Sequence, residues 1–255
     1  MTSDTQPTKT ATGVLVVVAA HNEADRIATT LAALAATFPG ALLWVADDGS
    51  SDGTAQLAEA AGASVVRSER VVGKGGAMTL AARAALAGIV EGAPRAPASR
   101  TPSNGGGHER LEDWIAVLCD GDLGDSAAQL GPLVEAVRGG DADVAVAAFA
   151  RRVGGGLGLA LGFARWAIRR RCGLALRAPI SGQRALRAST LARVLPFARG
   201  FGMEIGMTID AARAGARVRE IDVDLSHRAT GRTFGGFVHR GRQLLDFIRV
   251  YVTKR

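Results

Sequence analysis

A run of apolar residues near the start of the chain, GVLVVVAA at positions 13–20, restricts the fold more than any other segment. The run is short and rich in β-branched valine, so it predicts a strand. Because it shows no alternation of apolar and polar residues, both of its faces must be covered. Such a strand is typical of a parallel sheet that has helices on both sides. The polar residues His21, Asn22 and Glu23 follow it at once.

The same order of short apolar runs and helical segments repeats along the chain. This alternation predicts an α/β fold with one Rossmann-like, doubly wound, mostly parallel sheet and helices on both faces. Further strands are expected at 41–46, 64–67, 114–119, 144–149 and 218–225. Helices are expected after Asp25, which can cap the first of them, and at 54–61, 76–87, 126–138, 157–171, 204–214 and 234–252.

The 255 residues suit one large domain with a short segment at each end. Residues 1–12 are polar and are predicted to form a disordered tail. The domain itself is expected to span 13–232, with a first half at 13–125 and a second half at 126–232. Within the first half, residues 91–113 are rich in Pro, Gly, Ser and charge and are predicted to be a mobile insertion. Residues 233–255 predict an amphipathic, basic helix.

The net charge of +7 favours anionic partners such as nucleotide phosphates, lipid phosphates or nucleic acid. Nucleic acid is not expected, because no basic run is interleaved with aromatic residues. Cys119 and Cys172 lack the spacing of a disulfide framework or a zinc site, and the N-terminal residues lack the apolar region of a signal peptide. These features favour a cytoplasmic protein. The last helix either contacts the inner face of a membrane, packs on the core, or pairs with a second subunit.

Acidic residues follow the predicted strand that ends near position 119. In a doubly wound sheet, ligands bind at the carboxyl ends of the strands, where the strand order reverses. Asp120 and Asp122 come at such a place with one glycine, Gly121, between them. Two carboxylates at this spacing can bind Mg²⁺ or Mn²⁺, which prefer oxygen ligands. The same three residues also suit a solvated acidic turn.

Two further motifs belong to the same predicted edge of the sheet. Lys74 lies in a glycine-rich loop before a helix, where it and the backbone N–H groups can face an anion. A glycine-rich turn with a solvated lysine is the alternative. Asp47 and Asp48 end the second strand, and two adjacent carboxylates repel unless one has a donor. We expect a nucleobase N–H or a ribose hydroxyl to supply that donor.

Taken together, the motifs resemble glycosyltransferase family 2 and related enzymes of the GT-A fold. They are Ala20-His21-Asn22-Glu23, the block Asp47-Asp48-Gly49-Ser50-Ser51-Asp52-Gly53-Thr54, the loop Gly73-Lys74-Gly75, and Asp120-Gly121-Asp122-Leu123. The resemblance is greatest to polyprenyl-phosphate sugar synthases of the dolichyl-phosphate mannose synthase type and to glucosyl-3-phosphoglycerate synthases. It implies that 13–125 bind a nucleotide-sugar and that 126–232 bind the acceptor.

The resemblance also implies roles for single residues. Nucleotide-sugar binding falls to Ala20, His21, Glu23, Asp48, Lys74, Asp120 and Gly121, and metal binding to Asp120, Asp122 and His227. Asp122 is the expected catalytic residue on the metal side. Ser181, Gln183 and Arg184 match a segment that is expected to contact an acceptor phosphate.

The reaction is left open between two alternatives. Inverting transfer of a hexose from a UDP- or GDP-sugar to a polyprenyl phosphate or a hydroxyl acceptor is the first. A hydroxyl acceptor needs a base, and Glu204 is the candidate, although it can instead hold the start of its helix. Retaining transfer to a small phosphorylated acid is the second. A non-enzymatic basic module that binds a membrane or nucleic acid is the alternative from another class.

Overall fold

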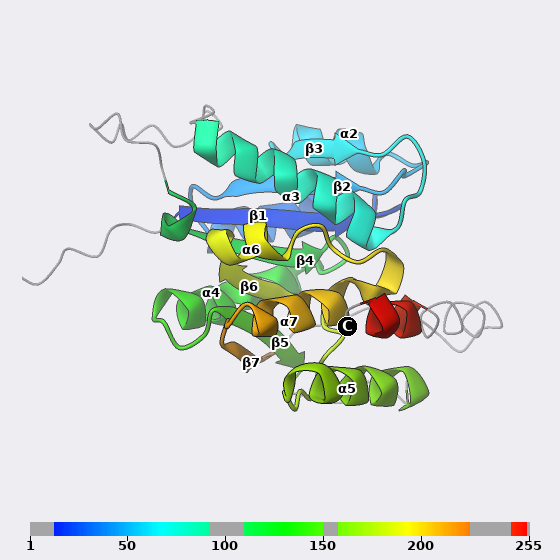
Figure 1. Cartoon of the computed structure of the whole chain (residues 1–255). Helices are drawn as coiled ribbons and strands as arrows, with labels where there is room; N and C mark the ends of the chain where they lie inside the picture. The colour runs from blue at the N-terminus through cyan, green and yellow to red at the C-terminus, as the bar shows by residue number, and fades with distance from the viewer. Residues whose placement is uncertain (1–12, 92–109, 150–157, 225–245, 254–255) are drawn as a thin grey trace, which may run out of the picture.

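The computed structural model describes residues 13–91, 110–149, 158–224 and 246–253 (Figure 1). The predicted tail at 1–12, most of the predicted insertion at 91–113 and a large part of the predicted helix at 233–255 lie outside these residues. The ends of the insertion are corrected, because Glu91 still belongs to a long helix and Leu111–Asp113 form a 3₁₀ turn.

One sheet of seven strands forms the centre of the protein, in the order β3-β2-β1-β4-β6-β5-β7. Strand β6 runs antiparallel to both of its neighbours, and the other paired strands are parallel. The strands are β1 (Gly13–Ala20), β2 (Leu42–Asp47), β3 (Ser64–Arg67), β4 (Trp114–Asp120), β5 (Val144–Phe149), β6 (Arg184–Arg187) and β7 (Val218–Val223). The predicted doubly wound, mostly parallel sheet is confirmed.

Helices cover both faces of the sheet, as the apolar strands require. Strand β1 shows why, since Val16 and Val18 pack into one apolar cluster while Leu15 and Val17 pack into the other. The first cluster is closed by α1 (Ile27–Thr37), α2 (Thr54–Ala60) and α4 (Gly131–Arg138). The second is closed by α3 (Lys74–Glu91), α6 (Ala188–Val194) and α7 (Met203–Arg213), which lie in front of the sheet in Figure 1.

A third apolar cluster lies beside α7, away from the sheet. Helix α5 (Gly158–Cys172) and the C-terminal helix (residues 246–253) supply most of it, and Leu176 together with Ile205 and Ile209 of α7 completes it. Two 3₁₀ turns, η2 (Gly124–Leu130) and η3 (Gly200–Gly202), precede α4 and α7. The C-terminal helix therefore docks on the second half of the domain.

Several local predictions are corrected by the structure. Strand β6 and helix α6 were not predicted, because RALR is short and begins and ends with arginine. The predicted helix at 126–138 is divided into η2 and α4. Asp25 does not cap α1, whose first residue follows Arg26 without a side-chain cap. Cys119 and Cys172 are both free, and no helix within the described segments is long and apolar enough to cross a membrane.

Candidate functional site

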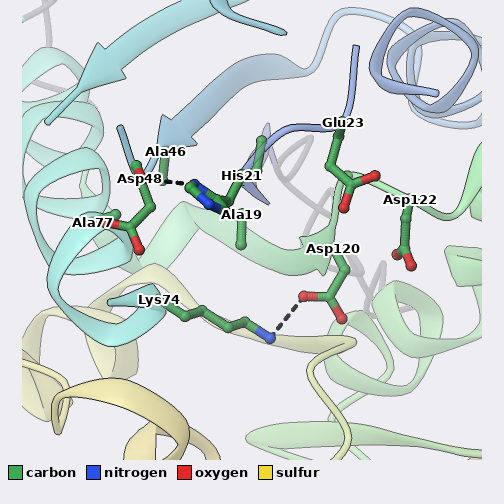
Figure 2. Close-up of a pocket in the computed structure, with 11 residues that line it drawn as sticks. Ala19, His21, Glu23, Ala46, Asp48, Lys74, Ala77, Asp120 and Asp122 are labelled. Carbon is green, nitrogen blue, oxygen red and sulfur yellow. Dashed lines mark hydrogen bonds and ion pairs between the residues drawn. The ribbon is translucent and has the colours of Figure 1, made fainter. Parts of the chain in front are cut away.

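A pocket of about 230 Å³ lies where the strand order reverses between β1 and β4. The ends of β1, β2 and β4 and the first turns of α3 form it, which is the place where open α/β sheets bind ligands. Its lining residues are Ala19, Ala20, His21, Glu23, Ala46, Asp48, Lys74, Ala77, Asp120, Gly121 and Asp122 (Figure 2). The structure thus brings together all seven residues predicted for the nucleotide-sugar, together with Asp122.

The turn that follows β4 lies against the end of β1. It consists of Asp120, the last residue of β4, followed by Gly121 and Asp122. The N–H of Gly121 donates to the carbonyl oxygen of Ala19 at 2.8 Å. A Cβ at Gly121 would lie 3.2 Å from that same oxygen, so the glycine lets the turn approach β1 closely. Figure 2 shows the carboxylates of Asp120 and Asp122 on the same side of the pocket as that of Glu23.

Lys74, at the start of α3, is the cation of the pocket. Its Nζ lies 2.7 Å from Asp120 Oδ1 and 2.9 Å from Glu204 Oε1. Burial alone would lower the pKa of Lys74, but the two carboxylates outweigh burial and raise this pKa above its ordinary value. Lys74 therefore stays protonated across the neutral range and bridges the two acidic groups.

The segment before β6 closes the other side of Asp120. Gln183 donates from Nε2 to Asp120 Oδ2 at 2.7 Å, and Ser181 Oγ donates to Gln183 Oε1 at 3.2 Å. Gly182 packs directly on the ion pair, since a Cβ there would lie 2.6 Å from Lys74 Nζ and 2.9 Å from Asp120 Oδ2. This segment positions the Asp120 carboxylate.

The prediction that Arg184 contacts an acceptor phosphate is corrected. Its guanidinium is fully buried and donates to the carbonyl oxygens of Ser181 and Pro179 and to Thr208 Oγ1. Burial lowers the pKa of Arg184 to about 10. In this position the side chain braces the turn that carries Gln183. Ser181 and Gln183 are themselves only 4% and 1% exposed, so their side chains face Asp120 and the protein interior.

The expectation that a nucleotide supplies the donor for Asp47 or Asp48 is also corrected. The Asp48 carboxylate accepts hydrogen bonds from Val72 N–H at 2.7 Å and Gly73 N–H at 3.0 Å. Asp47 accepts from Ser50 N–H at 3.0 Å and lies 3.3 Å from Arg67 Nε. Both carboxylates therefore have donors within the protein, and Asp48 is the anion that the loop before α3 faces.

Hydrogen bonds connect the loop after β1 to the loop after β2. His21 donates from Nδ1 to the carbonyl oxygen of Asp48 at 2.9 Å, because a carbonyl can only accept. Asn22, at φ 57°, accepts from Ser51 N–H through Oδ1 at 2.8 Å, and its own N–H donates to Ser50 Oγ at 2.9 Å. These contacts hold His21 and Glu23 in the pocket wall.

The residues fit a divalent metal in part. Within the described residues, no hydrogen bond or ion pair engages the Asp122 carboxylate, and no group of three or more His, Cys, Asp or Glu side chains could hold a metal ion. The Asp120 carboxylate is held by Lys74 Nζ and by Gln183 Nε2. His227, the third predicted ligand, lies outside the described residues. A metal here would need diphosphate or water oxygens in addition to Asp120 and Asp122.

Sequence reasoning missed two features of the pocket. Ala46 and Ala77 line it, and alanine in an apolar strand or helix gives no functional signal. The hydrogen bond from Gln183 to Asp120 was also missed, although Gln183 itself was predicted as a site residue. The contact joins residues 63 positions apart in the sequence, so only the fold reveals it.

Comparison with known proteins agrees with this geometry. Residues 15–90 match the family model described as glycosyl transferase family 2. An undecaprenyl-phosphate mannosyltransferase from Micrococcus luteus is 30% identical over 243 residues, which cover 88% of this chain and 89% of that protein. The chain belongs to glycosyltransferase family 2. It is accordingly a glycosyltransferase, and the fold is the GT-A fold of that group.

Solved structures give the same result for this glycosyltransferase. Glucosyl-3-phosphoglycerate synthase from Mycobacterium tuberculosis, in complex with Mn²⁺, UDP and glucosyl-3-phosphoglycerate, is 26% identical with a TM-score of 0.67. The match covers 95% of this chain and 80% of that one. The same enzyme in complex with Mn²⁺, UDP-glucose and phosphoglyceric acid has a TM-score of 0.68 at 25% identity, over 96% of this chain and 80% of that one.

Replacing Lys74 with methionine is expected to destabilise this glycosyltransferase by about 2 kcal/mol at pH 7.5, because Asp120 and Glu204 lose their shared counter-charge. Urea unfolding of wild type and variant measures the difference in the free energy of unfolding. Arg83→Met, on the exposed face of α3, is the control. A deficit no larger than that of Arg83→Met would contradict the explanation.

Proposed function

We propose that this glycosyltransferase transfers a hexose from a UDP- or GDP-sugar to a polyprenyl phosphate, with Mg²⁺ or Mn²⁺ bound at Asp120 and Asp122. The observation that carries the proposal is the convergence of these two carboxylates and Lys74 in the pocket between β1 and β4. The relative from M. luteus, which is named for transfer to undecaprenyl phosphate, supports this acceptor class.

The donor is proposed to lie across the ends of β1, β2 and β4. Ala20, His21 and Glu23 would contact the base and ribose from β1, and Asp48 would contribute from β2 while it stays bonded to Val72 and Gly73. Lys74 lies close enough to Asp120 to reach the same diphosphate. Gly121 would keep the turn close to β1, so that its backbone forms part of the donor pocket.

A divalent metal suits the carboxylates on chemical grounds. Mg²⁺ and Mn²⁺ prefer carboxylate oxygens, and Asp120 and Asp122 place two carboxylates in the wall of the pocket. We propose His227 as a further ligand. When bound, the metal supplies charge neutralisation for the departing nucleoside diphosphate. Asp122 would hold it, and Gln183 and Lys74 would fix the orientation of Asp120.

A phosphate acceptor changes the role of Glu204. A phosphate is already an anion and needs no general base, so an inverting attack can proceed without one. In the structure Glu204 is 6% exposed and pairs with Lys74, which suits a positioning residue better than a base. Inversion of the anomeric centre is part of the proposal. So is a peripheral position at the inner face of the cell membrane, where such an acceptor lies.

Retaining transfer to a small phosphorylated acid is the second candidate. The solved structures of glucosyl-3-phosphoglycerate synthase favour it, because they contain UDP or UDP-glucose, Mn²⁺ and phosphoglyceric acid or its product. Their identity to this chain is 25–26%, slightly below that of the M. luteus enzyme. Both candidates place the same donor in the same pocket and differ in the acceptor.

A transfer assay distinguishes the two candidates. Thermal unfolding with UDP-, GDP- and dTDP-sugars, with and without Mn²⁺, first identifies the donor, because a bound ligand raises the melting temperature. The matching labelled sugar is then offered with undecaprenyl phosphate in detergent or with 3-phosphoglycerate. Label in the lipid phase, in the inverted anomeric configuration, is the expected result. Label in a glycosyl phosphoglycerate whose anomeric configuration is that of the donor would favour the second candidate over the proposal.

A further inference from the structure

The outer side of α5 and the C-terminal helix carries large apolar side chains in contact with solvent. Trp166 is 50% exposed, Ile248 40% and Val252 52%. The rings of Trp166 and Tyr251 lie 4.8 Å apart between centroids and join the two helices across this side. Ile248, Tyr251 and Val252 share one face of the C-terminal helix by their spacing of three and four residues. We call these four residues the aromatic surface.

The inner sides of the same helices are already used. Phe247 and Val250 are 0% and 4% exposed and pack with Ala164 and Ile168 of α5 in the third apolar cluster. The aromatic surface is therefore not the core face of a displaced helix. It is a second apolar face, and large exposed apolar faces mark places of interaction with a partner or a membrane.

The charge around the aromatic surface is positive. Arg169 and Arg170 are exposed and lie three and four residues after Trp166, on the same face of α5. Helix α5 contains no acidic residue. Arg171 places its guanidinium 4.0 Å from the centre of the Tyr251 ring. Arg249 is exposed beside Ile248 and pairs with Asp246 at 3.5 Å, so Arg169 and Arg170 carry most of the uncompensated charge. Asp246 is the one acidic residue within the described C-terminal helix.

Tryptophan and tyrosine next to arginine are typical of a surface that contacts the headgroup region of a bilayer. Their rings have an apolar body and a polar edge, so they are favoured at the level of the lipid headgroups. The long arginine side chains can reach anionic headgroups while their stems stay against apolar atoms. A neutral or cationic partner would not compensate the charges of Arg169 and Arg170.

The first turn of α7 connects this surface to the donor pocket. Glu204 of that turn pairs with Lys74 in the pocket, and Ile205 packs in the apolar cluster below the aromatic surface. Figure 1 shows the C-terminal helix beside α5 and the start of α7. The first turn of α7 and then the layer of α5 and the C-terminal helix lie between the pocket and this surface. A helix with its side chains is about 10 Å across, so the pocket and a bilayer on this surface would be separated by roughly two helix diameters.

We propose that the aromatic surface, with Arg169 and Arg170, docks this glycosyltransferase on a bilayer that contains anionic lipid. The ligand class is the anionic phospholipid headgroup together with the outer acyl region. The purpose of the contact rests on the proposed polyprenyl-phosphate acceptor, since a docked enzyme would hold its pocket close to a phosphate that stands at the bilayer surface. The contact itself needs neither donor nor acceptor.

Vesicle binding by the full chain tests the proposal. Wild type is expected to sediment with vesicles of phosphatidylcholine that contain about 30% phosphatidylglycerol, and to bind pure phosphatidylcholine much more weakly. Arg169→Glu with Arg170→Glu should weaken binding about tenfold or more, and Trp166→Ser should weaken it by a similar factor. Matched changes on α3, Arg83→Glu and Leu80→Ser, should leave binding unchanged, since both residues are exposed on another face.

Tryptophan fluorescence checks the geometry independently of any loss of fold. Of the three tryptophans, Trp114 is buried, Trp44 is half-buried in β2, and Trp166 is exposed. A blue shift on addition of anionic vesicles should come from Trp166 and should be lost in Trp166→Phe, which retains Trp44 and Trp114. Equal binding of wild type and the double arginine variant would overturn the proposal. So would a dimer in light scattering that Trp166→Ser dissociates, because a second copy would then cover the surface.

The proposed acceptor and the proposed membrane surface can be rejected independently of each other. Vesicle binding together with no transfer to undecaprenyl phosphate in detergent would reject the acceptor and leave the surface in place. Transfer in detergent by a protein that ignores anionic vesicles would reject the surface and leave the acceptor in place.

Discussion

Replacement of Asp122 by alanine is expected to lower metal-dependent sugar transfer about 100- to 1,000-fold. The Asp122 carboxylate lies in the pocket and is not engaged by a hydrogen bond or ion pair within the described residues. Removal of the group should therefore disturb the fold little. The loss should appear as a lower rate and a higher Mn²⁺ requirement, because the other proposed ligand, Asp120, is already held by Lys74 and Gln183.

Steady-state transfer rates over a Mn²⁺ titration measure this effect. Asp125→Ala is the matched control, because Asp125 is an exposed acidic residue on η2, three positions further along the chain. It removes the same charge close to the pocket without belonging to its lining. Full activity of Asp122→Ala at ordinary Mn²⁺ concentration would remove Asp122 from the proposed catalytic role, and equal losses in both variants would reduce the effect to net charge.

Replacement of Gly75 by alanine should destabilise the fold by about 3 kcal/mol or more, since overpacking that moves backbone atoms is costly. A Cβ at Gly75, in the first turn of α3, would overlap the carbonyl oxygen of Ala198. That oxygen belongs to the backbone of the segment before η3, so it cannot turn away like a flexible side chain. The segment would have to move from α3, and η3 and the start of α7 would move with it.

Gly162→Ala is the matched control for Gly75→Ala. Gly162 also lies inside a helix, α5, but a Cβ there would meet no atom within 4 Å. It should leave stability unchanged or raise it by up to about 1 kcal/mol, because alanine favours helices over glycine. Urea unfolding of the three proteins measures both changes. A Gly75→Ala variant as stable as wild type would show that the contact between α3 and the segment before η3 is loose.

The first half of the domain could be predicted from the sequence because its signals are local. The strand at 13–20 is apolar on both faces, and the structure buries both faces in separate clusters. The predicted strands at 64–67 and 144–149 agree with β3 and β5 residue by residue. The pocket followed from one rule, since polar residues after neighbouring parallel strands must meet at the same edge of the sheet.

The second half of the domain was harder to predict from the sequence. Its contacts join residues that are distant in the sequence, and some of its buried positions carry residue types that are usually exposed. Strand β6 begins with Arg184, a residue type that is seldom fully buried, so its sequence does not suggest a central strand. The guanidinium is tolerated there only because three oxygens of the fold accept its hydrogen bonds. The donors to Asp48 were missed for a similar reason, since they are backbone N–H groups of a loop 24 and 25 residues away.

The position of Lys74 has a consequence for how the two substrates influence each other. One ammonium group pairs with both Asp120, at the end of β4, and Glu204, at the start of α7. A donor whose diphosphate attracts Lys74 must weaken the ion pair between Lys74 and Glu204. This ion pair connects the first half of the domain to the second. Binding of donor and acceptor would then be thermodynamically coupled, and such coupling acts equally in both directions. The affinity for the donor should therefore differ between enzyme alone and enzyme with acceptor bound.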